Sequence, residues 1–320
     1  MEIQDFIILS VSFFGLISAT KTTFSFIKWV YVMFLRPPKN LKETYGSWAI
    51  ITGCTDGIGK FLSFELASKG LNLLLVGRNP SKLEATTKEI KEKYGDIEVK
   101  TVEIDLAECG SDELATKMEG EMEGLDVGIL INNAGLAYPY SRYLHEVDLE
   151  LMNSVINVNV EAATWITRSV ICAMLKKNEK KKKGAIVNIG SGSSVVVPSF
   201  PFNSIYASTK AYLAMFSKSI HLEYKHQGID IQCQIPLFVA TKMTRFRKSN
   251  MIVASTEKYA KESIRCIGYD QICIPIFSHS VQCFLLKLLP DSLIDWCQFR
   301  FYLGLRNKAL AKAQNQRKVL

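Results

Sequence analysis

The chain has 320 residues, a formal net charge of +8 and a hydrophobic content of 48%. This length exceeds the usual single domain, but one α/β domain with terminal extensions accommodates it. The eight cysteines are scattered without a C-x-x-C pair and there are only four histidines, so neither a disulfide framework nor a zinc site is indicated. We therefore expect free thiols in a reducing cytosol, no metal and, because no binding fold accompanies the charge, no nucleic acid.

The first part of the chain is apolar. Phe6–Thr20 carries no charge, and the hydrophobic trend continues past Lys21 through Phe24–Leu35. Fifteen residues are too few to cross a bilayer comfortably, but a lysine can snorkel, so the longer segment can span. The alternative is a cleaved signal peptide, although the N-terminal residues lack positive charge and no clean small-residue cleavage site follows. Basic residues on the C-terminal side favour a cytosolic location for the rest of the chain; they are Lys21, Lys28, Arg36, Lys39 and Lys42.

A glycine-rich turn follows the first predicted strand, the apolar and β-branched run Trp48–Thr52. Helical spacing begins at Lys60, directly after the turn. Glycines allow the backbone to approach a phosphate closely, and a helix N-terminus offers free N–H groups. The spacing is G-x-x-x-G-x-G, which differs from the G-x-G-x-x-G dinucleotide fingerprint. A tight strand-to-helix turn without a ligand is the alternative. The candidate cofactor-binding residues here are Gly53, Thr55, Asp56, Gly57, Ile58 and Gly59.

The end of the second predicted strand, Leu71–Gly77, indicates which cofactor binds. An acidic residue near this point usually binds the ribose 2′-hydroxyl of NAD, whereas arginine suits a 2′-phosphate. Here the strand is followed by Arg78, and Lys60 is a second candidate cation. We therefore expect NADPH in preference to NADH. The alternative is that Arg78 is an ordinary surface cation at a strand end.

Two further strands end in polar residues. Val99–Leu106 contains Asp105, which is placed to cap the adenine side of a cofactor pocket. Gly128–Asn132 runs into an Asn-Asn turn, where amides can tie neighbouring strands together. For Asn132 a structural role is favoured, whereas Asn133 can also contact the cofactor ribose.

Predicted helices alternate with these strands. Pro80–Tyr94, Ser111–Met122 and Glu150–Lys177 have helical spacing. This alternation is typical of βαβ units and predicts a doubly wound parallel sheet of the α/β class. A cofactor in such a sheet binds at the carboxyl ends of the strands.

Tyr206 and Lys210 are the candidate chemical groups. Residues four apart on a helix share one face, and an ammonium beside a phenol lowers a tyrosine pKa that is otherwise about 10. Ser193, thirteen residues before Tyr206, can hold a substrate oxygen, and Ser191 and Ser194 compete with it for this role. Together these groups suit protonation of a carbonyl that receives a hydride. The alternative is a solvated lysine beside a packed tyrosine.

These motifs, in this order and spacing, resemble the short-chain dehydrogenase/reductase family from about Trp48 to Met243. The resemblance implies a Rossmann-like doubly wound sheet. Within the family the chain is most similar to the very-long-chain 3-oxoacyl-CoA reductases of the microsomal elongase, plant type, also called β-ketoacyl reductases or 17β-hydroxysteroid dehydrogenase type 12. Leu237 after Pro236, where Pro-Gly is commoner, supports this subfamily. The stretches that carry the closer match are 34–41, 45–53, 124–135 and 232–243.

The resemblance implies a role for each catalytic residue. Tyr206 is expected to protonate the ketone oxygen, Ser193 to hydrogen-bond it, and Lys210 to lower the tyrosine pKa and hold the nicotinamide ribose. Asn159, rather than Asn157, is expected to anchor a proton-relay water. Such donors stabilise the alkoxide that develops as hydride arrives. The cofactor set also includes Val239 and Thr241, the latter at the nicotinamide carboxamide.

The implied activity is NADPH-dependent reduction of 3-oxoacyl-CoA to 3-hydroxyacyl-CoA in very-long-chain fatty acid elongation. The implied setting is the endoplasmic reticulum membrane, with the catalytic domain in the cytosol and with the condensing enzyme, dehydratase and enoyl reductase as partners. Two alternatives remain: a 17β-type hydroxysteroid dehydrogenase, and a weakly active scaffold subunit of the elongase complex. The expected parts are an N-terminal membrane-anchoring helix and basic linker at 1–40, the NADP-binding domain at 41–270, and a hydrophobic or amphipathic extension at 271–320.

Three other segments keep alternatives open. The basic run at Lys176–Lys183 is either a solvated loop or attracts anionic lipid or the phosphates of coenzyme A. Ile272–Leu289 is a second membrane contact, a lid over an acyl chain or an ordinary core helix. The C-terminal Arg317–Leu320 resembles a dibasic retrieval signal of endoplasmic-reticulum membrane proteins.

Overall fold

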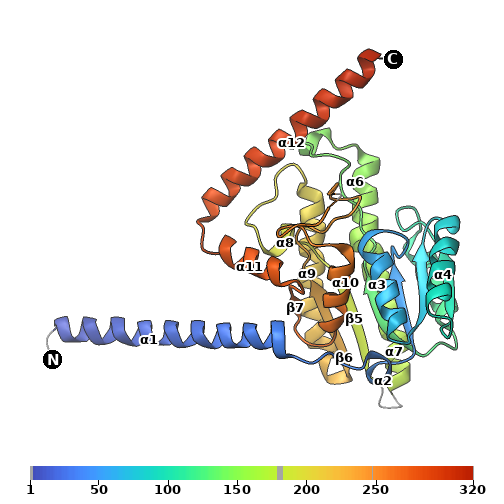
Figure 1. Ribbon diagram of the computed structural model, residues 1–320, viewed down its shortest axis with the longest axis horizontal. Coiled ribbons are helices and arrows are strands. Elements are labelled where there is room, and N and C mark those ends of the chain that lie inside the picture. The colour runs from blue at the N-terminus through green and yellow to red at the C-terminus, as the bar shows by residue number, and fades with distance from the viewer. Residues whose placement is uncertain (1–2, 179–182, 247, 320) are drawn as a thin grey trace. The chain divides into compact units, whose positions relative to one another are not determined.

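The computed structural model describes residues 3–178, 183–246 and 248–319. Two compact units make up the chain, Met1–Pro38 and Lys39–Leu320. The first unit consists of α1 (Ile3–Val30) and the π-helical turn η1 (Tyr31–Leu35), shown in Figure 1. With 33 residues and a mean hydropathy of 1.6 in its most apolar window, Ile3–Leu35 is long and apolar enough to cross a membrane.

The second unit is built on a sheet of seven strands, all parallel, in the order β3-β2-β1-β4-β5-β6-β7. This confirms the predicted doubly wound α/β fold. The first strand is the one expected from the sequence, and the next three begin or end within three residues of their predicted bounds. The strands are β1 (Trp48–Thr52), β2 (Asn72–Gly77), β3 (Val99–Glu103), β4 (Val127–Asn132), β5 (Gly184–Ile189), β6 (Ile229–Gln234) and β7 (Ile272–Cys273).

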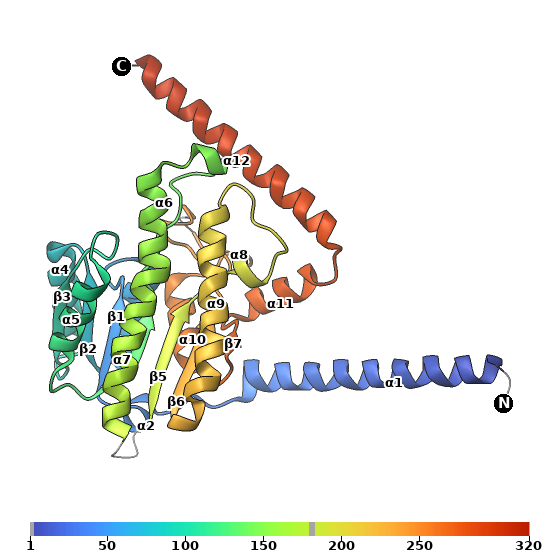
Figure 2. The same ribbon diagram turned by 180° about the vertical axis from the view of Figure 1, so that it is seen from behind.

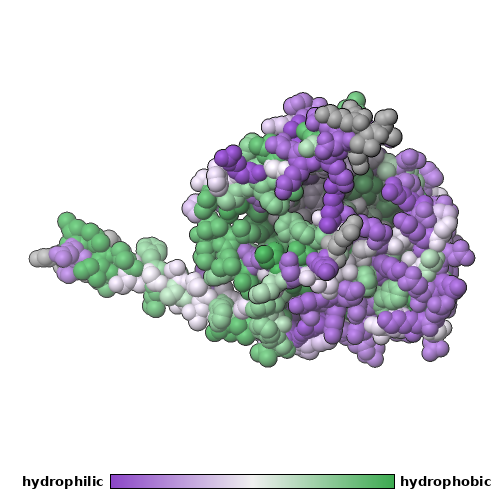
Figure 3. All heavy atoms as spheres, turned by 45° about the horizontal axis from the view of Figure 1, so that its top comes forward, coloured by the Kyte–Doolittle hydropathy of each residue, from purple (hydrophilic) through white to green (hydrophobic). Residues whose placement is uncertain are grey.

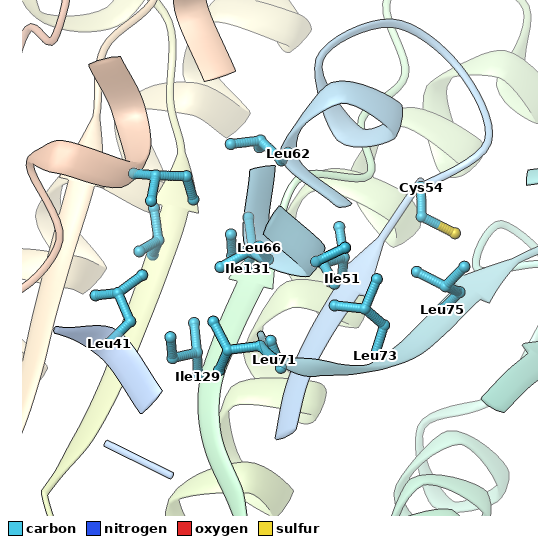
Figure 4. Close-up of a cluster of buried hydrophobic side chains, with 14 of the residues drawn as sticks. Leu41, Ile51, Cys54, Leu62, Leu66, Leu71, Leu73, Leu75, Ile129 and Ile131 are labelled. Carbon is cyan, nitrogen blue, oxygen red and sulfur yellow. The ribbon is translucent and has the colours of Figure 1, made fainter. Parts of the chain in front are cut away.

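The central strands β1, β4 and β5 are buried at every position, because both faces of the sheet are covered. In β1, Ile51 belongs to the core on one face and Ile50 to the core on the other. Leu75 and Leu74 alternate in the same way in β2. Figure 4 shows Ile51 and Leu75 in the first of these cores, together with Leu62 from a covering helix.

Helices cover both faces of the sheet (Figures 1 and 2). On the face of Ile51 lie α3 (Gly57–Ser68), α4 (Pro80–Lys93) and α10 (Thr256–Arg265). On the face of Ile50 lie α5 (Ser111–Met122), α7 (Ala163–Asn178) and α9 (Ser204–Tyr224). The remaining helical elements are α2 (Leu41–Thr44), η2 (Leu144–Glu146), α6 (Leu149–Ile156), α8 (Gly192–Val195), η4 (Lys225–Gln227), α11 (Phe277–Leu286) and α12 (Asp291–Val319).

The helix expected over Glu150–Lys177 is interrupted. Between α6 and α7 the chain forms the π-helical segment η3 (Asn157–Ala162). Inside it Asn159 is fully buried and hydrogen-bonded to a neighbouring loop. A π-helical turn holds one residue more than an α-helical turn, and hydrophobic periodicity does not reveal it because the partners of Asn159 are distant in sequence. Such π-bulges are frequent at functional sites.

Ile272–Leu289 forms strand β7 and helix α11 rather than one core helix. His279 and Cys283 of α11 are buried, whereas Phe284 and Leu288 are exposed. Most of the basic run at Lys176–Lys183, and the side chains of Arg317–Leu320, lie outside the described residues.

His279 joins α11 to the loop after β6. Its Nδ1 accepts a hydrogen bond from Leu237 N at 3.3 Å, and its Nε2 lies 3.1 Å from the carbonyl oxygen of Phe238. Both contacts are satisfied by a neutral imidazole that carries its proton on Nε2. Burial lowers the pKa of His279 to about 4, Lys258 acts in the same direction, and the Phe238 carbonyl opposes them.

This contact predicts a loss of stability in acid. Between about pH 6.5 and pH 4 the unfolded chain binds a proton at this histidine and the folded chain does not, so the free energy of unfolding should fall by up to about 3 kcal/mol. Denaturant unfolding of the detergent-solubilised protein at several pH values measures this. The stability advantage over His279→Gln should shrink as the pH falls through this window. An advantage that does not change with pH would contradict the prediction.

Candidate active site

The sheet order reverses beside β1, which lies between β2 and β4. In open α/β sheets, ligands bind at the carboxyl ends of the strands at such a switch point. Thr52 ends β1, and its Oγ1 accepts hydrogen bonds from the backbone N–H groups of Asn133 and Ala134, both at 3.0 Å. The Asn133 Nδ2 donates to the carbonyl oxygens of Thr52 and Gly53, also at 3.0 Å. Asn133 therefore braces the glycine turn from the neighbouring strand.

The turn admits no side chain at two of its glycines. A Cβ on Gly59 would lie 2.2 Å from the carbonyl oxygen of Gly53. At Gly53 a Cβ would lie 2.9 Å from the Cα of Ala134, and the φ angle is +65°. Asp56 begins α3, with Oδ1 accepting from Gly57 N at 2.8 Å. The helix N-terminus thus begins directly after the turn, at the edge where a phosphate would bind.

Thr55 and Ile58 were also predicted for the cofactor pocket, and both pack against neighbouring residues. Thr55 lies beside Gly77, where a Cβ on the glycine would meet its methyl group at 3.5 Å, and Ile58 packs against two of the hydrophobic cores. Asn132 bridges strands, with Nδ2 donating to Thr167 Oγ1 and Asn188 Oδ1 at 2.8 Å each. Asn132 thus takes the structural role expected for it.

The two candidate cations at the second strand differ in their exposure and in their ion-pair partners. Arg78 has a side chain that is 68% exposed, and its Nη1 lies 3.5 Å from Asp105 Oδ2. The other oxygen of Asp105 accepts from Ala107 N at 3.0 Å, so the carboxylate is held in place. Lys60 instead pairs with Glu89 of α4 at 2.7 Å. Arg78 is therefore the cation placed beside Asp105.

Lys210 and Asn159 converge on the loop after β4. Lys210 is 4% exposed, and its Nζ donates to the carbonyl oxygen of Ile189 at 2.8 Å. Asn159 Oδ1 accepts from Leu136 N at 2.8 Å, and its Nδ2 donates to Thr209 Oγ1 at 2.9 Å. A Cβ on Gly135 would lie 3.4 Å from Lys210 Nζ and 3.6 Å from Asn159 Oδ1. The two side chains thus flank Gly135.

Burial dominates the protonation of the tyrosine–lysine pair. It lowers the pKa of Lys210 to about 8 and raises the pKa of Tyr206, a rise that a hydrogen bond with the Ser191 side chain opposes. In the protein alone, burial outweighs any lowering of the phenol pKa by the ammonium. The reason is that Lys210 directs its ammonium at the Ile189 carbonyl, while desolvation disfavours the phenolate.

Ser191, rather than Ser193, has the hydroxyl that lies against Tyr206. Ser191 begins α8, and its Oγ accepts from the backbone N of Ser193 at 3.2 Å and from Ser193 Oγ at 2.9 Å. Ser193 is thus one hydrogen bond further from the phenol. The choice of Ser193 relied on its distance from Tyr206 and therefore on the length of the loop between them. The end of strand β5 is the better reference, because Ser191 follows its last residue, Ile189, by two positions.

A cleft of about 680 Å³ opens between the glycine turn and the loop after β6. Thr241 approaches the turn, since a Cβ on Gly57 would lie 3.4 Å from its methyl group. Lys242 pairs with Asp56 at 2.5 Å across the cleft. Val239 is buried at the base of this loop, where its carbonyl oxygen accepts from Thr244 Oγ1 at 2.6 Å. Lys312 of α12 also lines the cleft.

Aromatic residues of α12, which were not expected from the sequence, also lie at the site. Tyr302 is buried, its ring lies 4.7 Å from that of Phe200, and burial together with the nearby Tyr206 phenol raises its pKa. Phe202 has a φ angle of +63°, rare for a residue other than glycine, and packs on Phe299 at 5.2 Å. The cluster of aromatic residues at 299–302 was the feature of the sequence that could have indicated this contact.

Comparisons with known proteins agree with this geometry. Residues 47–251 match the family model described as short chain dehydrogenase. A very-long-chain 3-oxoacyl-CoA reductase-like protein of Arabidopsis thaliana is 44% identical, covering 97% of this chain and 98% of that protein. The very-long-chain 3-oxoacyl-CoA reductase of Rattus norvegicus is 34% identical, covering 84% of each.

A solved short-chain dehydrogenase from Sphingobium yanoikuyae in complex with NADPH is 27% identical, with a TM-score of 0.62, covering 75% of this chain and 92% of that one. The fold, the glycine turn at the switch point and the match over more than half the chain give one conclusion. This chain belongs to the short-chain dehydrogenase family and is an oxidoreductase that uses a nicotinamide cofactor.

Proposed function

We propose that the protein reduces 3-oxoacyl-CoA to 3-hydroxyacyl-CoA with NADPH, as a step of very-long-chain fatty acid elongation. The main support is sequence identity: this chain is 44% identical, over nearly the whole length of both chains, to a protein named for that activity. The likeness extends beyond the family region at 47–251 into the terminal extensions. It therefore covers both the catalytic residues and the elements that surround them.

The residues at the switch point fit a nicotinamide dinucleotide. The glycine turn leaves backbone N–H groups and the start of α3 available to a pyrophosphate, and Arg78 is exposed enough to meet a 2′-phosphate. Bound NADPH supplies the hydride for C3 of the substrate. Lys210 and Thr241 are the residues we assign to its nicotinamide end, Asp105 and Asn133 to its adenosine side.

The chain supplies the proton. Tyr206 donates its phenolic proton to the C3 oxygen as the C3–O double bond becomes a single bond. A raised pKa keeps that proton on the phenol until charge develops on the substrate oxygen. Ser191 accepts two hydrogen bonds from Ser193, which leaves its own hydroxyl proton for the same oxygen. Asn159, held by Leu136 and Thr209, is assigned to a water that returns a proton to the site.

We place the protein in the endoplasmic reticulum membrane, with its catalytic unit in the cytosol. The apolar helix Ile3–Leu35 and the basic residues that follow it support this location. The condensing enzyme, dehydratase and enoyl reductase of elongation are the proposed partners. We also propose that the chain has three parts: a membrane anchor at 1–40, a cofactor-binding domain at 41–270 and an extension at 271–320.

Replacing the proton donor tests the activity. Tyr206→Phe should lower kcat on 3-oxoacyl-CoA about 10²- to 10⁴-fold, the contribution typical of a positioned general acid, with NADPH binding retained. Tyr212→Phe on the same helix is the matched control and should remain active. The assay follows NADPH absorbance with detergent-solubilised protein, 3-oxoacyl-CoAs of graded length and a steroid ketone. Faster turnover of the steroid ketone would identify a hydroxysteroid dehydrogenase instead. If Tyr206→Phe still supported elongation fully, the protein would be a scaffold subunit and not the catalyst.

The two serines can be separated by matched substitutions. Ser191→Ala should lower kcat about 10²- to 10³-fold, as expected for loss of a donor to the developing alkoxide. Ser193→Ala should retain most of the activity, because its hydroxyl only supports Ser191. Thermal unfolding of both variants controls for the lost α8 cap. The reverse order of effects would return the catalytic role to Ser193.

Cofactor preference should depend on Arg78. Arg78→Ala should lower kcat/KM for NADPH about 10- to 100-fold, because charge-assisted hydrogen bonds contribute about 1.5–3 kcal/mol, and should hardly change kcat/KM for NADH. Lys60→Ala is the control, since Lys60 is paired with Glu89, and should leave the ratio of the two cofactors nearly unchanged. Equal turnover of NADH and NADPH by the unsubstituted protein would overturn the preference.

A further inference from the structure

The end of the chain exposes a large set of apolar side chains. They come from the end of α11, the turn that follows it and the outer side of α12, and each is between 42% and 66% exposed. Figure 3 shows hydrophobic residues gathered over this part of the molecule. We call this set the C-terminal apolar face; it comprises Phe284, Leu285, Leu288, Leu289, Leu293, Trp296, Phe301 and Leu305.

The inner side of α12 already holds the helix in place. Ile294 and Tyr302, two helical turns apart, are buried against the domain. Arg306, one turn further, forms an ion pair with Glu146 and lies over the ring of Tyr143 at 5.0 Å. With its inner side packed in this way, a helix of a soluble protein would have a polar outer side. The outer side of α12 instead exposes Leu293, Trp296, Phe301 and Leu305, which indicates a further contact.

The charges around the face are complementary to an anionic surface. Lys287, Arg300 and Lys308 are exposed on this part of the chain, and residues 277–319 contain only two aspartates and no glutamate. One of the aspartates, Asp295, is hydrogen-bonded to Ser199. Arg300 lies over the ring of the exposed Trp296 at 5.8 Å. Tryptophan and aliphatic residues bordered by arginine and lysine are typical of helices that lie in a bilayer interface.

These charges favour a lipid surface over a second copy of the chain. An apolar dimer formed through this face would bring two sets of the same cations together, including Lys287 and Arg300. A bilayer that contains anionic lipid buries the same side chains and attracts the cations, with about 1 kcal/mol for each one near the surface.

We propose that the C-terminal apolar face docks on an anionic lipid bilayer, as a membrane contact separate from the apolar helix Ile3–Leu35. The docking does not depend on the substrate. Its use does rest on the proposed function: behind the face, Phe299 contacts Phe202 and Tyr302 contacts Phe200. These aromatic contacts connect the face to the loop before Tyr206, along which a bilayer-held acyl chain would reach the catalytic phenol.

The test uses the full chain reconstituted into phosphatidylcholine vesicles with and without phosphatidylserine. Exposed and half-buried cysteines are first removed by Cys109→Ser, Cys172→Ser and Cys297→Ser. A fluorophore is then attached through Leu288→Cys, or through Lys91→Cys on α4 as the control. The label at position 288 should be quenched by brominated lipid and shielded from aqueous iodide, more strongly with phosphatidylserine. The label at position 91 should show the reverse.

Two results would overturn the docking. One is equal quenching by iodide at positions 288 and 91. The other is a label at position 288 that neither quencher reaches while two copies cross-link there, which would make the face a dimer interface.

A paired substitution separates docking from the proposed function. Leu285→Asp combined with Leu288→Asp should lower kcat/KM several-fold for long-chain 3-oxoacyl-CoA in vesicles and leave a short-chain substrate unaffected. Leu149→Asp, at another exposed leucine, should change neither. If no acyl-CoA is reduced at all, the proposed function fails, while lipid quenching at position 288 still decides the docking. Equal loss for long and short substrates would remove the link between docking and substrate entry.

Discussion

The site depends on how closely two backbone segments approach each other at the carboxyl ends of β1 and β4. A Cβ on Gly59 would lie 2.2 Å from the carbonyl oxygen of Gly53 and 2.3 Å from Asn133 Nδ2. Asn133 donates in turn to the carbonyl oxygens of Thr52 and Gly53. No side chain fits between these atoms, so the contact sets the path of the turn. The start of α3, and with it the proposed phosphate site, follows from that path.

Part of the surroundings of the site comes from residues beyond the region that matches the family model, which ends at residue 251. His279 of α11 holds the backbone at Leu237 and Phe238. Aromatic side chains of α12 hold the loop that carries Phe202 in a strained conformation. Some of the surroundings of the site are thus encoded outside the region that carries its chemistry. A short-chain dehydrogenase core can keep its proton donor while the C-terminal elements change what reaches it.

Much of the fold was predictable because buried parallel strands are continuous apolar runs. β1 and β4 could be identified from Trp48–Thr52 and Gly128–Asn132 without any tertiary information. The interruption at η3 could not be identified in this way, because it is stabilised by hydrogen bonds between Asn159 and residues far along the chain. The same limit applies at the serines: distance along the sequence from Tyr206 pointed to Ser193, whereas the fold brings the hydroxyl of Ser191 to the phenol.

The order of motifs along the chain determined the family, the strand-to-helix turn and the residue types available for proton transfer, since these follow from local spacing and backbone sterics. Tertiary structure alone decided which hydroxyl meets Tyr206 and how the tyrosine and lysine are protonated. Ser191 reaches the phenol through the fold of the loop after β5, and burial raises the pKa of Tyr206 while lowering that of Lys210. Desolvation depends on every neighbour packed around a group, and no pattern within one segment encodes that environment.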